Sequence, residues 1–153
     1  MKRPWIELNV SDGSGITWHE PPPFDTVTDT TITSVSHKNL TQGSLNEELG
    51  CGFNLTAGIL LRAVWFELKG VTVASYFAGQ SSATVPNSFA SRFNATWVRP
   101  RLTLIVFNVT SDDKGEYYCK VQTFSVSSGG QFWNRKIEVD VLGKFRDKAL
   151  VLA

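Results

Sequence analysis

The chain has 153 residues, of which 42% are apolar, 15 are Lys or Arg and 14 are Asp or Glu. This length and composition suit one folded domain and exclude an intrinsically disordered protein. The formal net charge of +1 argues against nucleic acid as the main partner, because binding to phosphates requires clustered Lys and Arg side chains. No run of about 20 apolar residues occurs, so we expect no membrane contact by this part of the protein.

The first 30 residues combine turn-forming segments with a polyproline run at residues 21–23. They offer too few apolar side chains for a core, and we interpret residues 1–30 as an N-terminal extension of uncertain structure. From residue 31 short β segments alternate with polar or glycine-containing turns, which predicts an all-β domain over residues 31–143. Residues 144–153 are expected to form a C-terminal linker or the start of a stalk.

Eight strands are predicted within this domain, at residues 31–35, 44–53, 62–69, 71–77, 92–96, 101–109, 116–124 and 136–142. The last strand has the clearest period of two, because its apolar side chains alternate with charged ones. The same period assigns an inward orientation to three residues of the second strand and three of the sixth: Leu45, Leu49, Cys51, Leu104, Val106 and Val109.

Five Asn-x-Ser/Thr sequons favour a secreted or cell-surface glycoprotein, and their asparagines are Asn9, Asn39, Asn54, Asn94 and Asn108. The two cysteines, Cys51 and Cys119, suit that compartment if they pair. A bridge between them would close a loop of 68 positions and stabilise the fold by about 4 kcal/mol. A pair of buried free thiols in a cytosolic protein is the alternative that the spacing leaves open.

The segment Asp-Lys-Gly-Glu-Tyr-Tyr-Cys at residues 113–119 ends in the second cysteine, and Trp65 follows Cys51 by 14 positions. Together these residues resemble the Cys…Trp…Asp-x-Gly-x-Tyr-x-Cys signature of immunoglobulin domains. The resemblance implies a V-type (V-set) β-sandwich of two antiparallel sheets, ABED and GFCC′. It also implies a disulfide between Cys51 and Cys119 across the two sheets, covered by the indole of Trp65.

The resemblance assigns structural roles to four further residues. Tyr117 is expected to donate its hydroxyl to the backbone just upstream, and Asp113 to pair with Arg92. Gly115 suits a turn conformation that a side chain would strain. The spacing of the cysteines favours the variable type and leaves room for a C′ and a C″ strand within residues 70–91. The last strand lacks the Phe-Gly-x-Gly bulge of antibody domains, which argues against antibody-style pairing of two domains.

The chain is poor in groups that could perform catalysis. Its two histidines, His19 and His37, have no spaced Cys, His or acid that would make a metal site or a triad. An acidic cluster at residues 112–116 is explained by the turn before Tyr117. We therefore expect no enzyme, no metal site and no cofactor.

By strand parity, Trp65 and Cys119 point inward, and their neighbours point to the outer side of the predicted GFCC′ sheet. Glu67 shares the parity of Trp65 and would also point inward, where a carboxylate is unfavourable, unless a bulge or an edge position exposes it. Four sequons fall in or beside strands A′, B, D and E, so glycans would leave this sheet bare. Exposed aromatic residues with a polar rim mark protein interfaces. The residues predicted to bind a partner are Val64, Phe66, Leu68, Tyr118, Lys120, Gln122, Phe132 and Trp133.

These observations favour an extracellular recognition or adhesion domain of a cell-surface receptor, with the same domain on an opposing cell as its first candidate partner. A secreted or viral immune-modulating glycoprotein that binds a heterologous receptor is the alternative. Carbohydrate binding by Trp97 and Trp133 is a third interpretation, although buried or interfacial tryptophans explain both residues. Self-association would favour the first interpretation, and a strictly monomeric domain the second.

Overall fold

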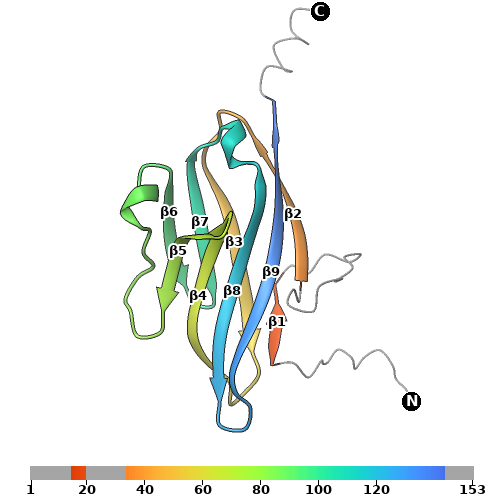
Figure 1. The fold of residues 1–153 in the computed structure, drawn as a ribbon, viewed down its shortest axis with the longest axis vertical. Helices are drawn as coiled ribbons and strands as arrows, with labels where there is room; N and C mark the ends of the chain where they lie inside the picture. The colour runs from red at the N-terminus through yellow and green to blue at the C-terminus, as the bar shows by residue number, and fades with distance from the viewer. Residues whose placement is uncertain (1–14, 20–33, 144–153) are drawn as a thin grey trace, which may run out of the picture.

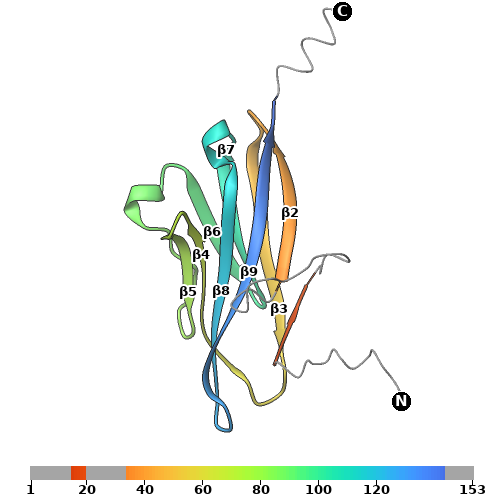
Figure 2. The ribbon, with the colours of Figure 1, turned by 45° about the vertical axis from the view of Figure 1, so that its right-hand side comes forward.

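The computed structural model describes residues 15–19 and 34–143, which form two β-sheets packed face to face (Figures 1 and 2). The four-stranded sheet has the order β1-β3-β7-β6 and the five-stranded sheet the order β2-β9-β8-β4-β5. The predicted all-β sandwich is therefore confirmed. The strands are β1 (Ile16–Trp18), β2 (Ser34–Thr41), β3 (Leu45–Leu55), β4 (Leu60–Leu68), β5 (Val71–Phe77), β6 (Phe93–Val98), β7 (Arg101–Asn108), β8 (Gly115–Ser125) and β9 (Gly129–Leu142), with short 3₁₀ helices η1 (Asn87–Phe89) and η2 (Ser111–Asp113).

The five-stranded sheet is mixed rather than antiparallel. Strand β2 runs parallel to β9, from Ser34 opposite Arg135 to Thr41 opposite Leu142, whereas the other pairs in the sheet are antiparallel. The prediction of two antiparallel sheets is thus correct for the four-stranded sheet and wrong at this one edge. Figure 2 shows β2 beside β9.

Of the predicted strands only 71–77 agrees with the structure at both ends, and the largest differences are in β2 and β9. Strand β2 extends to Thr41, and β9 begins at Gly129, so both are longer than the alternation of their apolar residues predicts. The expected C″ strand is absent from the described residues between β5 and β6. Only a bridge between Ser75 and Thr84 and the helix η1 occur there, because this polar segment has no apolar alternation to hold a strand on the core.

Part of the predicted extension belongs to the four-stranded sheet. Strand β1 pairs with the end of β3, with Ile16 opposite Leu55 and Trp18 opposite Phe53. Ile16 and Trp18 are buried while Thr17 between them is exposed, which is the period of two expected of a half-buried strand. The proposed domain boundaries stay predictions, and residues 1–14, 20–33 and 144–153, with Asn9 and the linker among them, lie outside the described residues.

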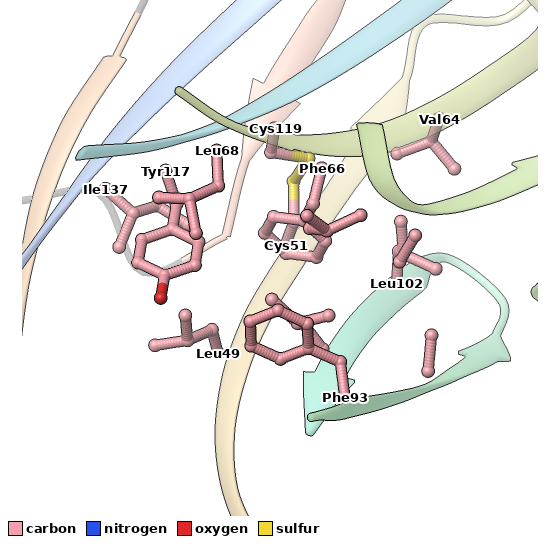
Figure 3. Packing of buried hydrophobic residues seen from close by; sticks show 14 of the residues in the cluster. Leu49, Cys51, Val64, Phe66, Leu68, Phe93, Leu102, Tyr117, Cys119 and Ile137 are labelled. Carbon is pink, nitrogen blue, oxygen red and sulfur yellow. A yellow bond between two sulfur atoms is a disulfide. The ribbon is translucent and has the colours of Figure 1, made fainter. Parts of the chain in front are cut away.

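The core lies between the sheets around the disulfide that joins Cys51 on β3 to Cys119 on β8 (Figure 3). Both cysteines are fully buried, and full burial of each large apolar side chain around them contributes about 1.5–3 kcal/mol. The predicted inward residues of β3 and β7 are buried with one exception: Leu45 is exposed. Asn46 has a φ of +56°, so the backbone there leaves the extended conformation and turns the preceding side chain out of the core.

Candidate partner-binding face

The turn that leads into β8 contains the buried carboxylate of Asp113. Its Oδ1 accepts a hydrogen bond of 2.8 Å from Arg92 Nη2, and its Oδ2 accepts one of 2.8 Å from the backbone N–H of Thr110. The hydroxyl of Tyr117 donates to the Asp113 carbonyl at 2.7 Å, and burial raises the pKa of Tyr117 well above its ordinary value. Gly115 has a φ of +149°, which favours glycine. These groups hold the turn rather than forming an accessible site.

The orientation of β4 is opposite to the predicted one. Phe66 is 0% exposed and lies directly beside the disulfide (Figure 3), opposite Cys119 in the register of β4 and β8. Val64 and Leu68 share its orientation and are also buried. Trp65 is half-buried on the other side of the sheet, where its indole N–H donates to Glu67 Oε2 at 2.8 Å.

The cover of the disulfide is thus Phe66, and the prediction that Val64, Phe66 and Leu68 face a partner is wrong. The family's spacing from Cys51 identifies Trp65 as the residue that covers the disulfide. The hydrogen-bond register instead places Phe66, the next residue, opposite Cys119. Two irregularities surround this segment, one between Leu61 and Ala63 and one between Phe66 and Glu67. The extra residue is Arg62 on β4 in the first and Val73 on β5 in the second, so only the first changes which residues of β4 share a face.

Trp133, predicted to meet a partner, is also buried. Its indole N–H donates to Thr123 Oγ1 at 3.0 Å within the core. Arg135 shares its parity on β9 and is buried too, where its Nη1 donates to the His19 carbonyl at 2.7 Å and its guanidinium lies 5.8 Å from the ring centre of Trp18. Arg135 therefore ties β9 to the chain next to β1, a role that the sequence analysis did not assign.

The middle of the outer face of the five-stranded sheet is polar. Lys120 Nζ lies 3.0 Å from Glu67 Oε1, beside the indole of Trp65. Burial raises the pKa of Glu67, but the hydrogen bonds from Trp65 and Lys120 and the charge of Lys120 outweigh it, so the pKa lies below its ordinary value. The predicted apolar centre is therefore replaced by a satisfied ion pair.

Further ion pairs continue toward the C-terminal end of β9. Lys136 Nζ lies 3.2 Å from Glu138 Oε2 and 3.7 Å from Glu116 Oε2, and His37 Nδ1 lies 3.0 Å from Glu138 Oε1. Tyr118 faces outward, as predicted, and donates its hydroxyl to Glu116 at 3.1 Å. Because these charges already have partners within the chain, a binding protein would have to desolvate pairs rather than isolated charges.

Apolar side chains gather instead at the other end of this face, next to the β8–β9 turn. Leu60 is 63%, Phe77 51% and Phe132 68% exposed. The register places Phe77 opposite Ala63 and Phe132 opposite Gln122 in one row across the sheet, and Leu60 opposite Phe124 in the next row. Arg62 lies 5.2 Å from the ring centre of Phe124. We call this group the hairpin-end patch, and its members are Leu60, Arg62, Phe77, Gln122, Phe124 and Phe132.

Of the predicted partner-binding residues, Gln122 and Phe132 lie in the patch, Tyr118 and Lys120 lie in the polar part of the same face, and the other four lie in the core. The sequence analysis missed Leu60, Phe77 and Phe124. The inward Cys119 gives the outward parity of Phe124 on β8, and the inward Phe66 gives that of Ala63, which lies opposite Phe77. Parity alone would turn Leu60 inward, because it lies six positions from Phe66, and the irregularity between Leu61 and Ala63 brings it to the outer face.

The sequons are distributed less simply than predicted. Asn54, Asn94 and Asn108 are exposed on strands of the four-stranded sheet. Asn39 is exposed on β2, which belongs to the five-stranded sheet, opposite Asp140 at its edge. A glycan there would stand at the end of the face remote from the hairpin-end patch. No residue of the patch belongs to a sequon.

Over residues 15–19 and 34–143 no group of three or more His, Cys, Asp or Glu side chains is arranged to hold a metal ion. The same ranges contain no helix long and apolar enough to cross a membrane.

No family profile and no curated protein matches the sequence. Many solved structures share the fold, and one of them is the structure of murine CRIg, with a TM-score of 0.58 and 15% sequence identity. The alignment covers 69% of this chain and 92% of the CRIg chain. Identity this low is informative about the fold alone. The chain is an immunoglobulin-like β-sandwich with one disulfide between its sheets.

Proposed function

We propose that this chain is a V-type recognition domain of an extracellular protein, on a cell surface or secreted, and that it binds a protein partner through the hairpin-end patch. The first partner proposed is a second copy of the same domain. The V-type assignment is supported by β5, which occupies the position of a C′ strand, by the parallel pairing of β2 with β9, and by the ion pair of Arg92 with Asp113. The disulfide and the sequons support an extracellular location.

The observation that carries the binding proposal is the exposure of Leu60, Phe77 and Phe132 at one end of the same sheet face. Phe77 on β5 and Phe132 on β9 are separated by β4 and β8, where Leu60 and Phe124 lie between them. Grouped apolar side chains of this size with a polar rim mark interaction surfaces, whereas singly scattered ones do not. The rim here is the ion pair of Lys120 with Glu67 on the next row of the sheet.

The composition of the patch suits a two-fold contact with itself. In a two-fold interface the same patch of both copies is in contact. A charged side chain at the centre of the patch would therefore lie close to its own counterpart and be repelled by it. Arg62 is the one charged member, and its guanidinium lies over the ring of Phe124, which leaves the phenyl and leucine side chains to meet one another.

Sedimentation equilibrium of the glycosylated domain from low to high micromolar concentration tests the proposal. We expect a reversible dimer in the unaltered protein, and Phe132→Glu should weaken it about 30-fold or more, as loss of a central aromatic anchor does. The matched control is Val98→Glu, because Val98 is 72% exposed but lies on β6 of the other sheet. That variant should dimerise as the unaltered protein does.

The outcomes separate the interpretations. A dimer that Phe132→Glu leaves intact would contradict the hairpin-end patch as the contact. A monomer at every concentration would contradict self-recognition and favour the alternative, a secreted or viral glycoprotein that binds a heterologous receptor.

A further inference from the structure

A hollow of about 560 Å³ opens between the end of β3 and the turn that joins β6 to β7. Small-molecule sites in proteins have volumes of about 300–1,000 Å³, so the hollow is large enough to hold an organic group. Its polar lining includes the exposed Arg99, and the larger apolar residues of its lining are Phe53, Leu55, Ile59, Leu61, Trp97 and Pro100.

The strand register explains why the sandwich is open here. The last pair between β3 and β7 is Gly52 with Arg101, and β3 continues to Leu55 beside β1 alone. One further hydrogen bond, from the Phe53 N–H to the Pro100 carbonyl at 3.2 Å, joins the two segments. Beyond it β3 and β7 are no longer paired, and Leu55 and Trp97 are half-buried.

Trp97 gives the hollow an aromatic wall. Its ring stacks on Tyr76 with the centroids 4.6 Å apart and the planes 13° from parallel, and it lies 6.3 Å from the ring of Phe53. The indole is therefore held rigidly and stays half-buried. Covering such a surface stabilises a protein in proportion to the apolar area removed from water.

A sequon forms part of the same lining. Asn54, Leu55 and Thr56 all border the hollow. Asn54 is exposed and alternates with Phe53 and Leu55, so a glycan on it would reach the hollow around the edge of β3, which is open where β3 has lost its pairing with β7. The contrast is Asn39, whose neighbouring hollow of about 320 Å³ is lined by no aromatic carbocycle and by four charged side chains, Lys114, Glu116, Glu138 and Asp140.

We propose that Asn54 carries an N-linked glycan and that its first sugars pack over this hollow. A pyranose ring presents C–H groups on its face, which pack on apolar and aromatic side chains, and hydroxyl and acetamido groups at its edge, which the guanidinium of Arg99 can bind as a donor. The occupant is thus part of the glycoprotein itself. The inference rests on the extracellular location proposed above but not on the hairpin-end patch.

The test uses the whole chain expressed in glycosylating eukaryotic cells. Mass spectrometry of the peptide that contains Asn54 should find it glycosylated. Thr56→Ala removes the sequon and Thr56→Ser retains it, while neither alters Asn54 itself. We expect Thr56→Ala to lower the Tm by about 4 °C or more, a shift that corresponds to a modest loss of stability in a domain of this size, and Thr56→Ser to leave it near the original value.

Two controls show whether the sugar acts through the hollow. Asn94→Gln removes a sequon on the outer face of the four-stranded sheet and should change the Tm less than Thr56→Ala. Ile59→Ser makes the lining polar, and in that background Thr56→Ala should have a smaller effect, as expected for interacting groups.

Enzymatic trimming of the folded glycoprotein avoids any question of misfolded variants. An endoglycosidase that leaves one N-acetylglucosamine on each asparagine should preserve most of the Tm, and complete removal should lower it. An unoccupied Asn54, or equal Tm changes for Thr56→Ala and Asn94→Gln, would overturn the inference. Sedimentation equilibrium on the same samples keeps this result separate from the partner-binding proposal, since a dimer can persist when the glycan is gone.

Discussion

Phe66 and Trp65 provide the sharpest test of the structure, because the immunoglobulin pattern and the register of β4 assign them opposite roles. Phe66 is 0% exposed and covers the disulfide (Figure 3). Truncation of such a side chain removes its burial and leaves a cavity, so Phe66→Ala should destabilise the domain by about 3–5 kcal/mol. Since small domains have stabilities of about 5–15 kcal/mol, this is a large share of the total.

Trp65→Ala should cost much less, although the indole is the larger side chain. Trp65 is half-buried on the outer face, and its one polar contact there is the 2.8 Å hydrogen bond to Glu67. Loss of this bond and of partial packing amounts to about 1–2 kcal/mol. Glu67 keeps Lys120 at 3.0 Å, so the truncation leaves no carboxylate without a partner.

Equilibrium unfolding in urea with the disulfide intact measures both changes. Far-UV circular dichroism is the suitable probe, because one variant removes a tryptophan, and equal m-values would allow the midpoints to be compared directly. Phe132→Ala is the matched control for residue type, since Phe132 is 68% exposed, and it should change the stability by less than about 1 kcal/mol. A larger loss for Trp65→Ala than for Phe66→Ala would refute the orientation of β4.

Two further predictions concern the buried hydroxyl and the ion pair. Tyr117→Phe should destabilise the domain by about 1–3 kcal/mol in urea unfolding, because the buried Asp113 carbonyl loses its donor. Burial raises the pKa of Tyr117, so above about pH 10 the tyrosine ionises in the unfolded chain before it does in the folded protein, and the unaltered protein should lose stability. If the stability of Tyr117→Phe fell with pH just as steeply in this range, the interpretation would be contradicted. The pKa of Glu67 is lower in the folded protein than in the unfolded chain. Its ionised form therefore stabilises the fold at a pH above the unfolded pKa of about 4.3, and this stabilisation is lost as the pH falls through the folded pKa. Glu67→Gln should reduce the loss of stability between pH 6 and pH 3. The reduction should be at most about 1 kcal/mol, because Glu67 and Lys120 are both partly exposed, and thermal unfolding at the two pH values measures it.

The general architecture could be predicted because it follows from local patterns. Alternation in residues 136–142 places Ile137 and Val139 in the core, and both are buried. The seven-residue segment that ends at Cys119 predicts the turn before β8, since this turn depends on residues close together in the chain. The disulfide to Cys51, 68 positions away, came from the resemblance to the immunoglobulin signature. Strand ends were less predictable, because pairing to a neighbour rather than the apolar pattern decides where β2 and β9 begin and end.

The face of β4 was predicted wrongly although the sequence contained the correct signal. Val64, Phe66 and Leu68 alternate with Glu67, which indicates a buried apolar side and a polar side. The family's spacing selected Trp65 and overrode that local pattern. The extra residue Arg62 in β4 lies between Cys51 and Phe66 and is a physical reason that a count from Cys51 fails, since an inserted residue reverses the parity beyond it.

The pattern within β9 predicts the orientation of Arg135 but not the partners that allow its burial. Its parity with Ile137 predicts an inward side chain, but a buried guanidinium is stable only with partners. One of these is the carbonyl of His19, 116 positions away in the chain, and another is the ring of Trp18. The partners become known only when β1 is seen to join the sheet, and β1 lies in residues that looked too polar to belong to a core.

The ion pairs on the outer face of the five-stranded sheet are the reason that the proposed binding site is placed at one end of it. A partner that covered the middle would have to remove the pair of Lys120 and Glu67 from water, and the desolvation of an ion pair opposes binding unless the partner replaces the lost hydration. Covering Phe77 and Phe132 has no such penalty and removes apolar area from water. The free-energy difference therefore favours contact centred on the hairpin-end patch, with the charged middle of the sheet as a rim that selects among partners rather than the source of affinity.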